Sequence, residues 1–248
     1  MKVVATYSIK GGVGKTSAAV NLAALAAKEG HRTLLWDLDP QAAATFLFRI
    51  KPRVRGGASK LVRGKRDPRA SLKGTDIDGL DLLPADFSYR HLDLLLDARK
   101  RPLDALAGVL DAVRPEYDLA ILDCAPSISL VSEGVFRASD LLLVPIVPAT
   151  LSVRTFEQLQ QFLDGQADPP PDVLAFLSMV DRRKRLHREL VTSLPQQLPA
   201  VAVATVPAAS VVERMGLNRE PVVLGAPRSP AARAYTALWA EVRERVLD

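Results

Sequence analysis

Short apolar runs and stretches of helical spacing alternate along most of the chain. The short runs are nearly continuous in apolar residues, which predicts strands buried on both faces of a sheet. They span residues 3–8, 33–37, 80–85, 117–123, 141–148, 174–179 and 202–207. Helical spacing covers residues 18–28, 89–113 with an interruption near Pro102, 152–163 and 230–246. This alternation predicts an α/β fold of three layers, a doubly wound and mostly parallel sheet with helices on both faces.

Two stretches interrupt the pattern. Residues 49–78 are rich in glycine, proline and basic side chains, which predicts a loop or short helices, and residues 166–171 form a proline-rich connection. A chain of 248 residues with 48% hydrophobic content can bury one sizeable core. We therefore expect a single domain over residues 1–248.

The lone cysteine and the length of the apolar runs exclude several classes of protein. Cys124 is the only cysteine, so the chain has no internal disulfide framework and no cysteine pair for a metal, and we interpret Cys124 as a small packed residue. No apolar run reaches the length of a membrane span, and the first predicted strand begins directly after Met1 without a visible secretory signal. We expect a cytoplasmic protein.

A glycine-rich turn joins the first predicted strand to the first predicted helix. It consists of Lys10, Gly11, Gly12, Val13, Gly14, Lys15, Thr16 and Ser17. The glycines allow backbone N–H groups to converge on phosphate oxygens, and the helix adds its positive N-terminal end. In such a loop Lys15 contacts the β- and γ-phosphates and Thr16 ligates Mg²⁺. A turn that only packed a helix on a strand would not require two lysines and a threonine at these spacings.

Acidic residues follow two of the predicted strands. Asp37 and Asp39 come at the end of the strand at 33–37, and Asp123 ends the strand at 117–123 after four apolar residues. Ligands of open α/β sheets bind at the carboxyl ends of the strands. Asp123 has the Walker B arrangement, and we expect it to hold Mg²⁺ through a water. Either Asp37 or Asp39, taken singly, could simply cap the turn that follows.

The phosphate-binding turn departs from the ordinary P-loop pattern at two positions. Ile9 stands where a glycine is expected, and Lys10 precedes the glycine pair. The string resembles the deviant Walker P-loop ATPases, which include ParA-type partitioning ATPases, MinD-like ATPases and the nitrogenase iron protein. The resemblance runs from about residue 2 to 238 and is loose only over 49–78. It implies a homodimer that sandwiches ATP, in which Lys10 reaches phosphates bound by the other subunit.

The resemblance also implies roles for residues outside the turn. Asp39 would position the attacking water and Asp37 would support the shell of the metal, so that Lys10, Lys15 and Asp39 form the catalytic set with ATP and Mg²⁺. The end of the strand at 174–179, with Met179, would lie beside the base. Relatives contact adenine through the backbone around the proline that matches Pro207.

Basic charge is concentrated in two segments. The net charge is +5, yet residues 49–73 alone carry ten Lys or Arg against one acid, and residues 181–188 carry five against one. The rest of the chain is therefore net acidic. Two basic patches on an acidic body indicate a polyanion partner. The competing interpretation, that each run is only a solvated face, remains open, above all for 49–73.

The resemblance favours the compact ParA type, whose members bind DNA without sequence preference when ATP drives dimerisation. That type implies a weak ATPase stimulated by a ParB-like or cargo-adaptor protein, and a nucleoid location. We expect the DNA-binding residues to be Arg182, Arg183, Lys184, Arg185, Arg188, Arg214 and Arg219, with Arg228 as an addition. One departure is that residues 208–211 lack the arginines that relatives often carry there.

Other branches of the family fit less well. The iron-protein branch needs two cysteines per subunit, and the larger plasmid partition ATPases have an N-terminal helix-turn-helix domain. MinD-like proteins end in a basic amphipathic helix that binds lipid, whereas residues 241–248 have mixed charge, so a membrane partner is not expected. An ATP-regulated membrane or assembly-positioning factor nevertheless stays the alternative. A ligase of the dethiobiotin-synthetase type would give no reason for Lys10.

Overall fold

A computed structural model describes residues 1–165 and 170–247 of the chain. Most of the proline-rich connection predicted at 166–171 therefore lies outside the described residues. Among the described residues, no helix combines the length and apolar character that crossing a membrane requires.

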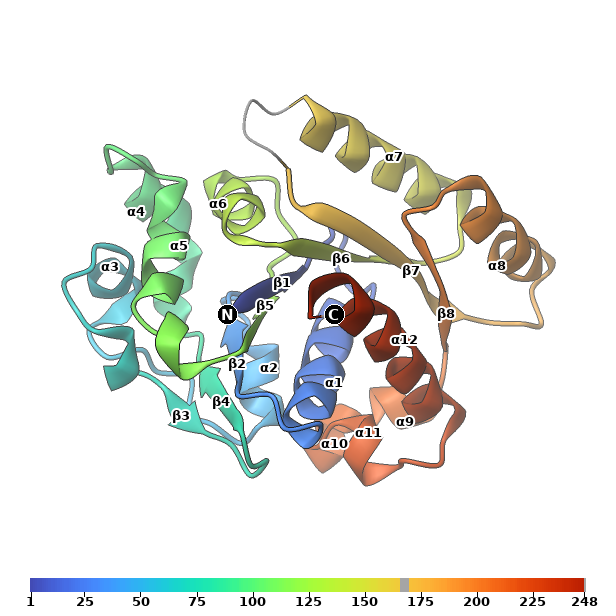
Figure 1. The fold of residues 1–248 in the computed structure, drawn as a ribbon, viewed down its shortest axis with the longest axis horizontal. Helices are drawn as coiled ribbons and strands as arrows, with labels where there is room; N and C mark the ends of the chain where they lie inside the picture. The colour runs from blue at the N-terminus through green and yellow to red at the C-terminus, as the bar shows by residue number, and fades with distance from the viewer. Residues whose placement is uncertain (166–169, 248) are drawn as a thin grey trace.

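The centre of the fold is a twisted sheet with the strand order β3-β4-β2-β5-β1-β6-β7-β8 (Figure 1). The strands are β1 Lys2–Thr6, β2 Thr33–Asp37, β3 Lys73–Gly74, β4 Leu80–Leu83, β5 Leu119–Asp123, β6 Leu141–Ile146, β7 Asp172–Val180 and β8 Val201–Pro207. All neighbouring pairs are parallel except β3 and β4. The predicted doubly wound, mostly parallel sheet is confirmed, and the short antiparallel edge strand β3 was not predicted.

Helices cover both faces of the sheet, as predicted. One face is packed by α3 Gly57–Val62, α4 Leu92–Asp97, α5 Asp104–Asp111, α6 Leu130–Ala138, α7 Thr150–Asp164 and α8 Arg185–Gln197. The other face is packed by α1 Lys15–Lys28, α2 Ala43–Leu47, α10 Met215–Asn218, α11 Val222–Gly225 and α12 Pro230–Val246. The short α9 Ser210–Glu213 follows β8, and single 3-10 turns lie at η1 Pro68–Ala70, η2 Phe87–His91 and η3 Arg114–Glu116. Figure 1 shows the two helical layers above and below the sheet.

Alternation along the central strands explains the two layers of core. Val3 and Ala5 of β1 belong to the buried cluster under α5 and α6, whereas Val4 belongs to the cluster under α1 and α12. Successive side chains of a strand point to opposite faces, so a strand that is buried on both faces must be apolar along most of its length, with an exception such as Asp123 at the end of β5. β5 is buried at every position. The continuous apolar runs of the sequence are the direct result.

The predicted helix at 89–113 is divided, as expected near Pro102. It consists of η2, α4 and α5, with a loop between α4 and α5. The short helices predicted as one possibility at 49–78 are confirmed in α3 and η1, whereas the strand β3 within this range was not predicted. No prediction covered α6 or α8. The polar surface of α8 and its internal Pro195 weaken the helical pattern there.

A buried hydrogen bond fixes the end of β2, which carries the acidic residues of interest. The Nε1 atom of Trp36 donates to the hydroxyl oxygen of Tyr89 over 3.1 Å, and both side chains are buried. Tyr89 lies in η2, which follows β4 in the sequence. Because an indole N–H that is buried without an acceptor is costly, this bond favours a single position for the strand end.

We expect Tyr89→Phe to lower the free energy of unfolding by about 1–3 kcal/mol, because it leaves the buried indole N–H of Trp36 without an acceptor. Urea denaturation measures this loss. Tyr117→Phe is the matched control, since the hydroxyl of Tyr117 bonds over 2.7 Å to the half-buried Asp81, which water can solvate. An unchanged urea midpoint for Tyr89→Phe would contradict the structural role of the bond.

Candidate nucleotide site

The phosphate-binding turn lies between the end of β1 at Thr6 and the start of α1 at Lys15. Gly14 has φ of 99°, in the left-handed region, and a Cβ atom there would lie 2.8 Å from the Oγ atom of Ser178. Only glycine fits both conditions. No side chain caps the N-terminus of α1, so the backbone N–H groups of its first turn are available to an anion.

A cleft of about 330 Å³ opens in front of this turn. Residues from six segments of the chain line it together, and nine of them were predicted to bind nucleotide or to act on it. These nine are Gly11, Gly12, Gly14, Lys15, Thr16, Ser17, Asp39, Met179 and Pro207. Met179 has the left-handed φ of 56°, a strained conformation for a side chain of its type, and is 43% exposed. The cleft has the size and the mixed lining of a nucleotide site.

Lys15 is buried beneath the loop that it belongs to. Its Nζ atom donates to the carbonyl oxygen of Lys10 over 3.0 Å, which holds the loop closed around the ammonium. Burial lowers the pKa of Lys15, while the neighbouring Asp123 raises it. The side chain therefore lies at the base of the cleft, ready to exchange a carbonyl oxygen for a phosphate oxygen.

The register of the sheet brings two carboxylates together under the cleft. Asp37 of β2 pairs directly with Asp123 of β5, and both are fully buried. Burial raises the pKa of Asp37 to about 6, and the pKa of Asp123 is raised by burial and by Asp37 beside it. Among the described residues, the Oδ2 atom of Asp123 has no hydrogen-bond partner. An orphaned oxygen and two adjacent buried acids fit a divalent cation.

The oxygens of Asp37, in contrast, are already occupied. The backbone N–H of Asp39 donates to Oδ1 over 3.1 Å, and Thr45 donates to Oδ2 from both its backbone N–H and its hydroxyl, each over 2.8 Å. This arrangement fits a supporting carboxylate rather than a direct metal ligand. Asp39 itself is half-buried and lines the cleft, with its Oδ1 atom accepting from the N–H of Gln41 over 2.9 Å.

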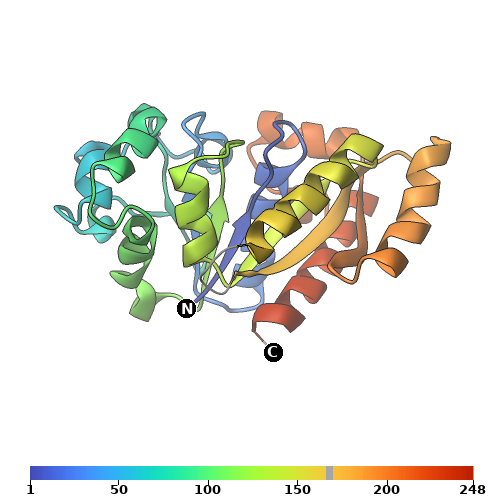
Figure 2. The ribbon, with the colours of Figure 1, turned by 90° about the horizontal axis from the view of Figure 1, so that it is seen from above.

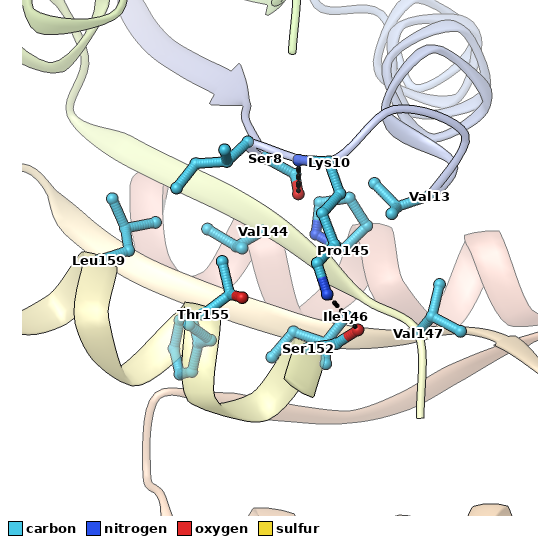
Figure 3. A pocket seen from close by; sticks show the side chains of 12 residues that line it. Ser8, Lys10, Val13, Val144, Pro145, Ile146, Val147, Ser152, Thr155 and Leu159 are labelled. Carbon is cyan, nitrogen blue, oxygen red and sulfur yellow. Dashed lines mark hydrogen bonds between the residues drawn. The ribbon is translucent and has the colours of Figure 1, made fainter. Parts of the chain in front are cut away.

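Lys10 extends away from the cleft of its own chain. Its Nζ atom donates to the Oγ atom of Ser152 at the start of α7, over 3.3 Å. Figure 3 shows the side chain of Lys10 directed to Ser152 in a small cavity beside β6. Val13, predicted to bind nucleotide, places its side chain in this cavity as well, so only its backbone remains for a phosphate.

Several polar residues of the site have no motif that marks them in the sequence. Thr45 joins Asp37 to the segment after β4, because its hydroxyl also accepts from the N–H of Ala85 over 3.1 Å. Ser178 and Tyr235 line the cleft, and Ser152 holds Lys10. Thr45 and Tyr235 lie inside α2 and α12, and Ser152 and Ser178 lie near an end of α7 and of β7, so no single sequence signal marks all four.

The basic residues predicted to bind DNA lie at the carboxyl ends of β7 and β8. Five of them occupy the turn before α8 and its first turn, where Arg183 is paired with Asp181 over 2.9 Å and Arg185 with Glu189 over 2.7 Å. Arg188 donates to backbone carbonyls. Arg214 lies between α9 and α10, and the guanidinium of Arg219 stacks on the ring of Phe46. Only part of the predicted cluster is thus without a carboxylate partner.

We expect Asp123→Asn to stabilise the nucleotide-free protein by about 1–3 kcal/mol at pH 8, because the substitution removes a buried charge. A raised pKa means that the folded state keeps its proton to higher pH than the unfolded chain, so the wild type loses stability as the pH rises. The gain should therefore shrink between pH 8 and pH 4. Thermal unfolding across this range measures it, with the exposed Asp111→Asn as a control. Destabilisation at pH 8 would contradict the expectation.

Comparison with known proteins gives relatives that match almost the whole chain. The model of a family described as an AAA domain matches residues 1–168. The chain is similar to the sporulation initiation inhibitor protein Soj of Bacillus subtilis, with 30% identity over 250 residues that cover 97% of this chain and 98% of Soj. It is 28% identical to the chromosome partitioning protein ParA of Caulobacter vibrioides, over 100% of this chain and 96% of that protein.

A solved structure gives the same fold. The cobyrinic acid a,c-diamide synthase of Mycobacterium smegmatis, solved with a bound ATP analog and magnesium, has a TM-score of 0.77 and 25% identity, covering 98% of this chain and 95% of that one. The family resemblance and the doubly wound sheet predicted from the sequence agree with these matches. The chain belongs to the ParA/MinD family of P-loop ATPases with a deviant phosphate-binding loop.

Proposed function

We propose that this chain is a nucleotide-driven switch, which dimerises on ATP, binds DNA without sequence preference and uses hydrolysis to partition or position a cargo on the nucleoid. A ParB-like or cargo-adaptor protein would stimulate a weak intrinsic ATPase. The names of the relatives support a role in partitioning. The observation that carries the proposal is the position of Lys10, whose ammonium lies outside the cleft of its own chain.

ATP is the proposed substrate and Mg²⁺ the proposed cofactor. The synthase structure holds an ATP analog with magnesium, and the present cleft combines the phosphate-binding turn with an orphaned oxygen of Asp123. Mg²⁺, when bound, would offset the negative charge of the phosphate oxygens and of the buried acids. Thr16 and Asp123 would hold it, while Asp37 orients the loop that carries Asp39.

Lys10 provides the proposed link between subunits. An ammonium that bonds to Ser152 rather than to its own P-loop can be exchanged to a phosphate of a second subunit at the cost of one hydrogen bond, about 1 kcal/mol. A charge-assisted bond to a phosphate is roughly twice as strong as a neutral one. Dimerisation would then depend on the presence of the γ-phosphate, which is what a switch requires.

Asp39 provides the proposed control of hydrolysis. Its carboxylate lines the cleft, as does that of Glu213, whereas Asp37 and Asp123 are fully buried. A carboxylate at the mouth of the cleft can accept a hydrogen bond from water and so direct it at the γ-phosphate. Such hydrolysis depends on positioning and electrostatics more than on covalent chemistry, with Lys15 stabilising the phosphate charge.

The proposed DNA-binding face lies at the ends of β7 and β8. These ends adjoin each other, because the N–H of Ala208 donates to the carbonyl oxygen of Val180 over 3.0 Å. The basic turn before α8 and the residues Arg214 and Arg219 follow them. A dimer would double the number of phosphate contacts, and phosphate contacts give sequence-independent affinity that falls steeply with salt.

We expect Lys10→Ala to keep nearly the unfolding temperature of the wild type and to lose ATP-dependent dimerisation, since within its own chain the ammonium makes one partly buried hydrogen bond, to Ser152, and its proposed phosphate contact lies on the second subunit. Light scattering on a sizing column, with and without ATP and Mg²⁺, measures this. Ser152→Ala is the matched control, because it removes the bond to Lys10 within one chain and should leave dimerisation equal or stronger. A Lys10→Ala protein that still dimerises on ATP would refute the proposed role.

We expect Asp39→Ala to bind ATP normally, to lose turnover by about 10²-fold or more, and to remain on DNA after excess ATP is removed. ATP turnover measures the first effect, and retention on DNA at about 150 mM salt measures the second. At this salt concentration the wild-type protein should be retained on DNA only when ATP is present. Asp111→Asn serves as the surface control. Rapid turnover in Asp39→Ala, or ATP-driven binding to lipid vesicles in place of DNA, would argue against the proposal and, in the second case, for the MinD-like alternative.

A further inference from the structure

Residues 51–66, here called the basic lobe, form the most highly charged segment of the chain that the proposed site does not use. The lobe contains no acidic residue, and its basic residues are all exposed. They are Lys51, Arg53, Arg55, Lys60, Arg63, Lys65 and Arg66. The segment includes α3 and the turns on either side of it.

The backbone of the basic lobe is firmly anchored. The N–H of Val54 donates to Asp86 over 2.8 Å, and the N–H of Ala58 donates to the hydroxyl of Ser88 over the same distance. Val54, Leu61 and Val62 are buried in the core under α4 and α5. With the apolar side chains fixed inside, the basic side chains are left on the outer surface.

The charges of the basic lobe are not neutralised by neighbouring acids. Among the described residues, none of its seven basic side chains forms an ion pair, because the nearby acids are engaged elsewhere. Asp67 and Glu116 pair with Arg69, and Asp76 pairs with Arg49. The turn before α8 differs, since Arg183 and Arg185 have carboxylate partners there. Like charges held together without counter-ions attract an external polyanion.

The surface of the lobe fits a phosphate backbone better than a protein. No large apolar side chain is exposed within it, whereas protein interfaces depend on buried aromatic or aliphatic anchors. Binding to the phosphates of a duplex needs only positive charge at suitable spacing. Duplex DNA, the polyanion of the proposed function, is therefore the partner class that these residues fit.

The basic lobe lies at the opposite end of the sheet from the proposed DNA-binding face. The strand order places β3 and β4 at one edge and β7 and β8 at the other. Figures 1 and 2 both show α3 and α8 at opposite ends of the molecule. No residue of the lobe lines the nucleotide cleft. The positive charges of the lobe are therefore complete in each isolated subunit, whether or not a nucleotide is bound.

We propose that the basic lobe is a second DNA-binding surface, which contacts duplex phosphates in the nucleotide-free monomer. The inference rests on the proposed function for its choice of polyanion. The contact is weak and sensitive to salt, since it consists of exposed charges without apolar burial. It keeps a released subunit near the DNA, and the ATP-dependent face then adds the contacts that survive physiological salt.

The test is a salt titration of binding to a fluorescent duplex of arbitrary sequence, with and without ATP and Mg²⁺. The lobe variant carries Arg63→Gln, Lys65→Gln and Arg66→Gln. The control variant carries Lys2→Gln, Lys28→Gln and Arg233→Gln, which are exposed, lie outside the lobe and remove the same net charge. A third variant carries Arg182→Gln and Lys184→Gln at the turn before α8.

Without nucleotide at about 50 mM salt, the wild type and the control variant should bind, and the lobe variant should lose affinity by about 10-fold or more with a salt slope lower by about 2–3. The lobe variant should still bind DNA more tightly when ATP is added. The third variant should bind DNA like the wild type without nucleotide but should show no increase in affinity with ATP. A second lobe variant, Lys51→Gln with Arg53→Gln and Arg55→Gln, should repeat the result if the first unfolds.

Equal salt slopes for the lobe and control variants would overturn the inference. So would a nucleotide-free wild type that binds polyglutamate but not the duplex, since the lobe would then be a surface for an acidic protein. The two proposals fail differently. A wild type without any gain from ATP removes the switch and leaves the lobe contact standing, whereas a wild type that binds DNA only with ATP removes the lobe contact alone.

Discussion

The pairing of Asp37 with Asp123 is the constraint on which the site depends. Parallel register sets these two acids side by side with no exposure to water, an arrangement that costs free energy unless positive charge and hydrogen bonds compensate. Thr45, the N–H of Asp39 and the buried Lys15 supply part of that compensation. The remaining deficit lies at the Oδ2 atom of Asp123, where a cation fits. The loop that carries Asp39 and the proposed cation position thus both depend on one pair of strand ends.

Much of this fold could be predicted from the sequence, because a strand that is buried on both faces has no polar positions and is visible as a run. The runs around Val4, Leu35 and Ile121 are of this kind. What the pattern missed has equally physical reasons. β3 has two residues, too few for any period, and α8 exposes most of its surface and contains Pro195. Tertiary packing, rather than local preference, holds these elements in place.

Some parts of the candidate site could likewise be predicted from the sequence and others could not. The turn at Lys10 to Ser17 and the acids at strand ends are local motifs, so their spacing alone was enough to place most of the turn and Asp39 at the cleft, and Asp37 and Asp123 beside it. The direction of the Lys10 side chain depends on Ser152, which is 142 residues away in the chain. The ion pair of Arg183 with Asp181, and the lack of an ion pair between Arg63 and any of the described residues, depend on side-chain positions that composition does not contain. Net charge therefore predicted a polyanion partner but could not rank the two basic segments.

The contact between Gly14 and Ser178 joins two parts of the molecule that have different tasks. With room for no Cβ atom between them, the phosphate-binding turn cannot move toward β7 without displacing the end of that strand. The strand ends at Val180, and the basic turn before α8 begins directly after it. A displacement of the loop by a fraction of an ångström must therefore reach the arginines through a few bonds of backbone. The pathway between the nucleotide cleft and the proposed DNA-binding face can be as short as one steric contact and one strand end.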